Sequence, residues 1–316
     1  MEIIKDTTDF YIQGPTAVAI GKFDGIHKGH RKLFSDLIEE KNNGKKVVIF
    51  TFDPSPASFF AGATVPGLTT RDEKRKWFEE NGVDVLIEFP MNAQTAATDP
   101  VEFIERYLVK QMGAKYVAAG QDVSFGDKGK GDYKLLDAMG QKLGFETHFI
   151  TKVEIEGREV SSSLIRQEVA DGHMENVSKL LGCPYTLHGI VSHGRALGRT
   201  IGIPTVNVIP SKEKLLPPNG VYYSIVRVGD KILRGMTNIG TKPTITDENL
   251  VVSETYLYDF SGDLYDKEIS VSLLSFKRPE MKFSGVDELK TQMSLDVENG
   301  RLYHHSIETA KYNWNE

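Results

Sequence analysis

Residues 16–38 read TAVAIGKFDGIHKGHRKLFSDLI. The first five residues form a short apolar run that is typical of a buried strand, and the last nine place large apolar side chains at helical spacing. Residues 21–30, between these two segments, contain three glycines and two histidines that are three positions apart. The stretch therefore predicts a strand, a glycine-rich turn and the N-terminus of a helix in direct succession.

Such a junction is suited to binding a phosphate group. Free amides at a helix N-terminus and the positive end of the helix dipole favour an anion. Gly29 allows the backbone to approach a ligand closely, while His27 and His30 flank it and could stabilise a phosphorus centre under attack. The alternative is that both are ordinary surface histidines at a turn. Two histidines and the distant Cys183 do not supply the four ligands of a zinc site.

Length and composition narrow the class of protein. The 316 residues are enough for two domains, each with its own core. The net charge of -6 argues against nucleic acid as a partner. The single cysteine excludes an intramolecular disulfide and fits a reducing compartment. The sequence lacks the features of a signal peptide and of a membrane span, so we expect a cytoplasmic protein with no membrane partner.

Strands and helices alternate in the first part of the chain, up to about residue 182. One expected helix begins at Pro100, where Thr98 or Asp99 can act as the cap. This alternation predicts an α/β domain with a parallel sheet covered by helices on both faces, and with ligands bound at the carboxyl ends of the strands. The expected strands are residues 16–20, 46–52, 84–89, 116–120 and 146–151.

The pattern changes after Pro184 to short strands that are broken by glycine and proline. These strands predict an antiparallel barrel or sandwich, and a helix from about residue 286 to 312 closes the chain. The expected strands are residues 185–192, 220–228, 231–237, 253–260 and 268–276. We place the domain boundary after residue 182, which gives domains 1–182 and 183–316.

Two further elements of the first domain are candidates for nucleotide binding. The glycine-rich residues 120–131 could approach a flat ring closely, and Asp122 could accept hydrogen bonds from a ribose or a base. The alternative is a flexible loop. Ser162 and Ser163 precede a helix and could simply cap it, but Arg166 in the same helix adds a planar fork of charged donors suited to polyphosphate.

The second domain contains a run of glycines and arginines that ends in an extended segment. Its open amides and local positive charge are typical of a nucleotide loop, although the Lys-Ser ending of a Walker loop is missing. The residues are Gly194, Arg195, Gly198, Arg199 and Gly202. Thr205 and Asn207 then share one face and offer two oxygen ligands to a hard cation such as Mg²⁺. The alternative is a basic turn before Pro204.

Taken together, these motifs resemble the bifunctional bacterial riboflavin kinase and FAD synthetase family over essentially the whole chain. The resemblance implies that the first domain is a Rossmann-like nucleotidyltransferase that makes FAD from FMN and ATP. It implies that the second domain is a β-barrel kinase that uses ATP and Mg²⁺ to phosphorylate riboflavin. The substrates would thus be ATP, riboflavin and FMN.

The resemblance also implies roles for residues of the first domain. His27 and His30 would contact the ATP phosphates and take part in catalysis, with pyrophosphate leaving as an FMN phosphate oxygen attacks the α-phosphorus. The other ATP-binding residues would be Gly21, Phe23, Asp24, Gly29, Asp122, Ser162, Ser163 and Arg166.

In the second domain, the resemblance implies that Thr205 and Asn207 bind Mg²⁺ and the ATP phosphates. Glu254 matches the catalytic glutamate that accepts the proton of the terminal ribityl hydroxyl as it attacks the γ-phosphorus. The pattern of its strand alone would make Glu254 an ordinary exposed residue. The remaining phosphate-binding residues would be Gly194, Gly198, Arg199 and Gly202.

Two positions depart from the commoner pattern of the family. Ser55 stands where many members have histidine, and Val123 stands where phenylalanine is usual. These changes affect the flavin side of the adenylyltransferase. Two alternatives to a bifunctional enzyme therefore stay open, namely an enzyme that retains one of the two activities and a flavin-nucleotide binding protein without turnover.

Overall fold

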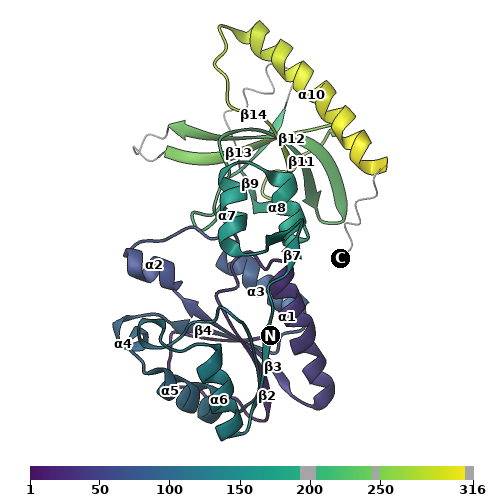
Figure 1. The fold of residues 1–316 in the computed structure, drawn as a ribbon. Coiled ribbons are helices and arrows are strands. Elements are labelled where there is room, and N and C mark those ends of the chain that lie inside the picture. Colours follow the sequence, from purple (N-terminus) through teal and green to yellow (C-terminus); the bar gives the residue numbers. More distant parts are fainter. Residues whose placement is uncertain (193–203, 244–248, 310–316) are drawn as a thin grey trace. The chain divides into compact units, whose positions relative to one another are not determined.

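The computed structural model describes residues 1–192, 204–243 and 249–309. The chain forms two compact units, Met1–Ser162 and Ser163–Glu316 (Figure 1). This division falls before the predicted boundary after residue 182, because helix α8 (Met174–Leu181) packs against barrel strands β9 (Tyr185–Ser192) and β14 (Glu268–Arg278). None of the described helices has the length and apolarity needed to cross a membrane.

The first unit is built on a six-stranded sheet in which every neighbouring pair of strands is parallel. In sheet order, the strands are β1 (Glu2–Lys5), β4 (Val85–Pro90), β3 (Lys46–Asp53), β2 (Thr16–Ile20), β5 (Ala114–Gly120) and β6 (Glu146–Ile150). The sheet confirms the predicted α/β class and all five predicted strands. The edge strand β1, which pairs with β4, was not predicted.

Alternate residues of the central strand face two separate cores. Ala17 and Ala19 belong to the core on the side of helices α1 (Lys28–Glu39) and α3 (Arg71–Glu80). Val18 and Ile20 belong to the opposite core. The helices that cover this second face are α6 (Tyr133–Leu143) and the π-helical segment η2 (Phe103–Gln111). Helices therefore cover both faces of the sheet, as predicted (Figure 1).

Side-chain caps set the starts of several helices in this unit. Asp99 accepts hydrogen bonds from the amides of Val101 and Glu102, and it thereby caps α5 (Pro100–Glu102). Of the two predicted caps, Asp99 is the one that makes these bonds. The helix then continues as η2, whose π-helical geometry was not predicted. The unit also contains α2 (Pro56–Ala61), α4 (Ala93–Ala96) and the 3₁₀ helices η1 (Glu40–Asn43) and η3 (Asp127–Gly129).

The second unit is a closed barrel of six strands in which all neighbouring pairs are antiparallel. The order around the barrel is β10 (Thr205–Val208), β13 (Asn249–Leu257), β12 (Lys231–Pro243), β11 (Gly220–Val228), β14 and β9. The structure thus selects the barrel over the sandwich. Helices α7 (Ser162–Ala170) and α8 precede the barrel.

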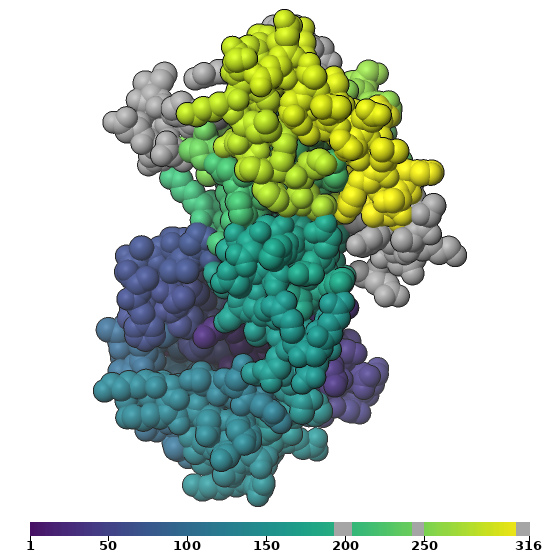
Figure 2. Space-filling view, turned by 45° about the horizontal axis from the view of Figure 1, so that its top comes forward, coloured from purple at the N-terminus to yellow at the C-terminus, as the bar shows by residue number. Residues whose placement is uncertain are grey.

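Helix α10 (Val286–Thr309) packs against the barrel and covers much of its visible face in Figure 2. Gly300 allows this close approach, because a Cβ there would overlap the Tyr258 hydroxyl. The Asp296 side chain is 1% exposed, and its Oδ2 accepts hydrogen bonds from Nε (2.9 Å) and Nη2 (2.7 Å) of Arg278 on β14. This buried ion pair attaches the helix to the barrel.

We predict that Asp296→Ala lowers the free energy of unfolding of the second unit by about 3 kcal/mol, because the Arg278 guanidinium is left buried without its carboxylate. Urea denaturation measures the change. The matched control is Asp259→Ala, which removes the partner of Arg301 in an exposed ion pair and should change stability little. Equal effects of the two substitutions would contradict the assigned role of the buried pair.

Candidate active sites

The turn after β2 has an unusual backbone. Phe23 and Ile26 adopt positive φ values of 49° and 42°, which are rare for residues with a large side chain, and Gly25 has a φ of 91°. The Phe23 ring is 1% exposed and packs edge-to-face on His30, with ring centroids 5.4 Å apart. A Cβ at Gly21 would lie 2.8 Å from this ring. The Phe23 ring therefore anchors the turn in the core, and Gly21 provides the space for it.

His27 is the N-cap of α1, a position that Ser, Thr, Asn or Asp usually holds. Its Nδ1 accepts a hydrogen bond from the His30 amide at 3.4 Å. This bond places the proton of neutral His27 on Nε2. The two imidazole rings stack with centroids 3.7 Å apart. Gly29 permits this arrangement, because a Cβ there would lie 3.2 Å from the His27 ring.

Burial keeps both imidazoles neutral at pH 7. It lowers the pKa of His27 to about 4, although the charges of Asp24 and Asp122 act in the opposite direction. Burial also lowers the pKa of His30 well below its ordinary value, and His27 adds to this effect. Within the described residues, His30 Nδ1 is buried without a hydrogen-bond partner. The pair can therefore donate N–H bonds to a phosphate, whereas the positive charge must come from other groups.

The turn is held from outside by a loop that is distant in sequence. Asp24 Oδ1 accepts hydrogen bonds from the amides of Leu68 (2.7 Å) and Thr69 (3.4 Å). In return, the Gly25 amide donates to Thr69 Oγ1 at 2.6 Å. Ser162 Oγ donates to the Asp24 carbonyl at 2.8 Å. The Asp24 carboxylate thus binds the loop, and sequence reasoning missed Leu68 and Thr69 because no motif marks them.

The glycine-rich segment after β5 is closed by its own backbone. Phe125 and Gly131 exchange two amide-to-carbonyl hydrogen bonds of 3.0 and 2.9 Å. The Phe125 side chain is buried in the core between the sheet and η2. Asp122 lies on the exposed side of the segment, close enough for its charge to act on His27. The segment is therefore hydrogen-bonded and anchored in the core, and Asp122 stands beside the histidine pair.

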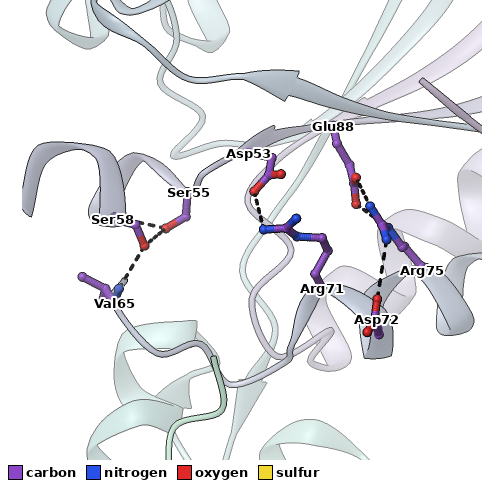
Figure 3. Close-up of polar contacts among 8 residues, drawn as sticks. All are labelled: Asp53, Ser55, Ser58, Val65, Arg71, Asp72, Arg75 and Glu88. Carbon is purple, nitrogen blue, oxygen red and sulfur yellow. Dashed lines mark hydrogen bonds and ion pairs between the residues drawn. The ribbon is translucent and has the colours of Figure 1, made fainter. Parts of the chain in front are cut away.

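Ser55 is the N-cap of α2. Its hydroxyl accepts a hydrogen bond from the Ser58 amide at 3.2 Å and lies 3.0 Å from the Ser58 hydroxyl (Figure 3). Ser58 Oγ also accepts a bond from the Val65 amide at 3.0 Å. The Ser55 side chain is thus used to start a helix and to hold the loop that follows it.

Two arginines attach the start of α3 to the carboxyl ends of neighbouring strands (Figure 3). Arg71 lies 3.0 Å from Asp53 at the end of β3. Arg75 donates from Nε and Nη2 to the two carboxylate oxygens of Glu88, which is 4% exposed on β4. The helix itself begins with a capping box, in which Thr70 and Glu73 bind each other's backbone amides. The N-terminus of α3 is therefore fixed to the sheet.

The structure groups most of the candidates predicted in the first domain. It brings together Gly21, Phe23, Asp24, His27, Gly29, His30, Asp122 and Ser162. Ser163 and Arg166 lie on α7 in the second compact unit. Gly194, Arg195, Gly198, Arg199 and Gly202, predicted for the kinase, lie outside the described residues.

In the second unit, strand register places Glu254 next to the predicted magnesium ligands. Asn207 on β10 is the partner of Glu254 on β13, which is in turn the partner of Asn238 on β12. Directly paired residues of antiparallel strands point to the same side of a sheet. Thr205 shares this side, since it is two residues from Asn207. The barrel therefore collects a carboxylate, two amides and a hydroxyl on one face.

A pocket of 310 Å³ opens beside this row of polar side chains. It is lined by Tyr256, which is two residues from Glu254 on β13, and by residues of α10. The α10 residues are Ser294, Val297, Glu298 and Arg301. Arg301 also forms two hydrogen bonds with Asp259, of 2.6 and 2.8 Å. Sequence reasoning missed this pocket, because only the packing of α10 on the barrel brings these residues to β13.

Comparisons with known proteins agree with both halves of this architecture. Residues 10–164 match the FAD synthetase family and residues 181–304 match the riboflavin kinase family. A protein of Escherichia coli (strain K12), named bifunctional riboflavin kinase/FMN adenylyltransferase, is 38% identical over 289 residues, which are 90% of this chain and 92% of that protein. The chain belongs to the family of bifunctional riboflavin kinases/FMN adenylyltransferases. This confirms the resemblance inferred from the motifs.

Two further relatives support this assignment. A protein of the same name from Listeria monocytogenes is 33% identical over 306 residues, which are 96% of each chain. A solved structure titled macrolide-efflux protein from Streptococcus pneumoniae has a TM-score of 0.83 and 32% identity, and the match covers 95% of this chain and 98% of that one. That title belongs to the pneumococcal protein, whereas both family matches of the present chain are to enzymes of flavin-nucleotide synthesis.

We predict that the first unit loses stability as the pH falls from 6.5 towards 4. In this window His27 is neutral in the folded protein but protonated in the unfolded chain, so acid favours unfolding. The loss is about 1.4 kcal/mol per pH unit for this group, and His30 acts in the same direction. Urea unfolding, followed by Trp77 fluorescence in a Trp314→Phe background, measures it.

The matched variant is His27→Asn, which keeps a side-chain acceptor at the N-cap but does not titrate. Its stability should depend less steeply on pH below 6.5, and it should resemble the parent most closely at pH 7.5, where both imidazoles are neutral. Parallel pH profiles for the two proteins would show that His27 is not held neutral by burial.

Proposed function

We propose that the chain catalyses two successive ATP-dependent transfers, with the domain boundary after residue 182. The second domain phosphorylates riboflavin to FMN, and the first domain adenylylates FMN to FAD and releases pyrophosphate. The observation that carries this proposal is that both family matches occur in one chain, one on the unit with the histidine pair and the other on the unit with the Glu254 row.

In the adenylyltransferase, an FMN phosphate oxygen attacks the α-phosphorus of ATP as the bond to the β-phosphate breaks. Neutral His27 and His30 donate N–H bonds to the phosphates, and the N-terminus of α1 adds the positive end of its dipole. Both contributions are dipolar, so positive charge would have to come from another group, and the sequence resemblance alone assigns that role to Arg166. By the same resemblance, Ser162, Ser163 and Gly29 would complete the phosphate site, and Asp122 would bind the nucleoside. Positioning supplies much of the rate.

In the kinase, Glu254 accepts the proton of the terminal ribityl hydroxyl as its oxygen attacks the γ-phosphorus and ADP leaves. Thr205 and Asn207 fit a Mg²⁺ ion that is held mainly through ATP phosphates, because they offer two neutral oxygens on the face that carries Glu254. When bound, the ion neutralises phosphate charge. We predict from sequence alone that Gly194, Gly198, Arg199 and Gly202 contact the same phosphates.

The pocket beside Tyr256 suits the flavin ring of riboflavin. Its volume of 310 Å³ lies at the lower end of the range for small-ligand sites. The Tyr256 ring offers a flat apolar surface, whereas Glu298 and Arg301 offer polar groups at the margin. Because Tyr256 is two residues from Glu254 on the same face of β13, a flavin bound here would place its ribityl chain near the proposed base.

We also propose that the enzyme works in the cytoplasm, where ATP is available and a single cysteine stays reduced.

A kinase with a weakened adenylyltransferase is the second candidate function. The residue that favours it is Ser55, where the sequence resemblance implies a departure from the family pattern and where the structure uses the hydroxyl to cap α2.

We predict that Glu254→Gln lowers FMN formation by about 10²- to 10⁴-fold, the usual contribution of a general base. FAD formation from supplied FMN should stay unchanged, because that reaction takes place in the other domain. Chromatographic separation of flavins in the presence of Mg²⁺ and ATP measures both rates. Equal losses at the two steps would contradict separate active sites.

The converse variant is His30→Ala, which should lower FAD formation by about 10²- to 10³-fold through the loss of one N–H donor. Riboflavin phosphorylation by the same preparation should be retained. His30→Gln serves as the control, because its amide N–H can replace the imidazole donor in part. A His30→Ala enzyme that makes FAD at the parental rate would remove this histidine from the mechanism.

A further inference from the structure

Residues 66–70 form a loop that is hydrogen-bonded to the turn at Asp24 and Gly25, and no sequence motif indicates a function for this loop. We infer that Thr69 is a positioning residue of the adenylyltransferase site, and that residues 66–70 form a brace that fixes the phosphate turn. This inference rests on the proposed function.

The turn needs external support, because its conformation is costly. Phe23 and Ile26 both occupy the left-handed region, and such residues persist only where the surrounding structure holds them. Ile26 directly precedes His27, the N-cap of α1. A relaxation of the turn would therefore move the His27 ring, which stacks on His30. The histidine geometry depends on whatever holds residues 24–26.

The brace holds the turn by hydrogen bonds in both directions. The Gly25 amide donates to Thr69 Oγ1 at 2.6 Å, while the Leu68 amide donates to Asp24 Oδ1 at 2.7 Å. The loop also runs close to the turn at Gly67, where a Cβ would lie 3.1 Å from Asp24 Oδ1 and 2.9 Å from the Thr69 carbonyl. Turn and loop are thus joined through both their backbones and their side chains.

The brace is itself fixed at its far end. Thr70, next to Thr69, starts α3 with a capping box. The ion pairs of Arg71 with Asp53 and of Arg75 with Glu88 then hold α3 on the ends of β3 and β4 (Figure 3). Ion pairs therefore connect the sheet to α3, the backbone connects α3 to Thr69, and a hydrogen bond connects Thr69 to the turn.

The other end of the same loop is hydrogen-bonded to the start of α2. The Val65 amide donates to Ser58 Oγ, which is hydrogen-bonded to Ser55 (Figure 3). Ser55 is the N-cap of α2, which follows β3. The loop is therefore held at both of its ends.

The test uses a pair of substitutions that separates the hydrogen bond from other effects. Thr69→Val removes the acceptor for the Gly25 amide but keeps the side-chain shape, whereas Thr69→Ser keeps the hydroxyl. Both activities and thermal unfolding are measured for each full-length variant.

We expect Thr69→Val to lower kcat for FAD formation by about 10- to 100-fold, as for other small displacements of a catalytic group. Riboflavin phosphorylation should be unchanged, and Thr69→Ser should restore FAD formation. The fluorescence-detected unfolding of Thr69→Val should remain cooperative, which separates misplacement from loss of the fold.

Two results would overturn the inference. The first is parental FAD formation by Thr69→Val, and the second is a failure of Thr69→Ser to restore the rate. Failure of the proposed function is distinguishable, because the unaltered protein would then convert no FMN to FAD.

Discussion

The constraint on which the first domain depends is the burial of two stacked imidazoles at the start of α1. Burial keeps His27 and His30 neutral, so they act as donors that carry no charge of their own. The stack requires a glycine at position 29 and a turn whose backbone adopts rare conformations. The proposed phosphate site therefore depends on the backbone of the turn as well as on the two histidine side chains.

In the second domain, strand register positions the candidate site residues, whereas in the first domain a turn with positive φ values does so. Glu254 is unremarkable in its own strand, where an isolated carboxylate usually faces solvent. Pairing of β13 with β10 places it opposite Asn207, and pairing with β12 places it opposite Asn238. Helix α10 adds the pocket beside Tyr256. The candidate base, the proposed Mg²⁺ ligands and the proposed flavin pocket thus lie on one face of the barrel.

Periodicity was sufficient to predict the α/β domain, the β-rich domain and the closing helix, because apolar side chains repeat at the spacing of each element. The edge strand β1 was missed because it is short and mostly exposed. The site was predictable where motifs are contiguous, as in residues 21–30. Thr69 and Arg301 were not, since hydrogen bonds and packing between distant segments decide their positions. For Ser55, sequence analysis predicted an effect on the flavin side of the adenylyltransferase, but it did not predict that the hydroxyl caps α2.

The central claim is that one chain carries two working active sites. The most direct test incubates the purified protein with Mg²⁺ and ATP, with riboflavin in one reaction and FMN in another, and separates the flavins by chromatography. The account predicts that FAD accumulates in both reactions and that FMN appears as an intermediate in the first. If FMN remains unchanged in the second reaction while riboflavin is phosphorylated in the first, the chain is a kinase alone and the account of the histidine site is contradicted.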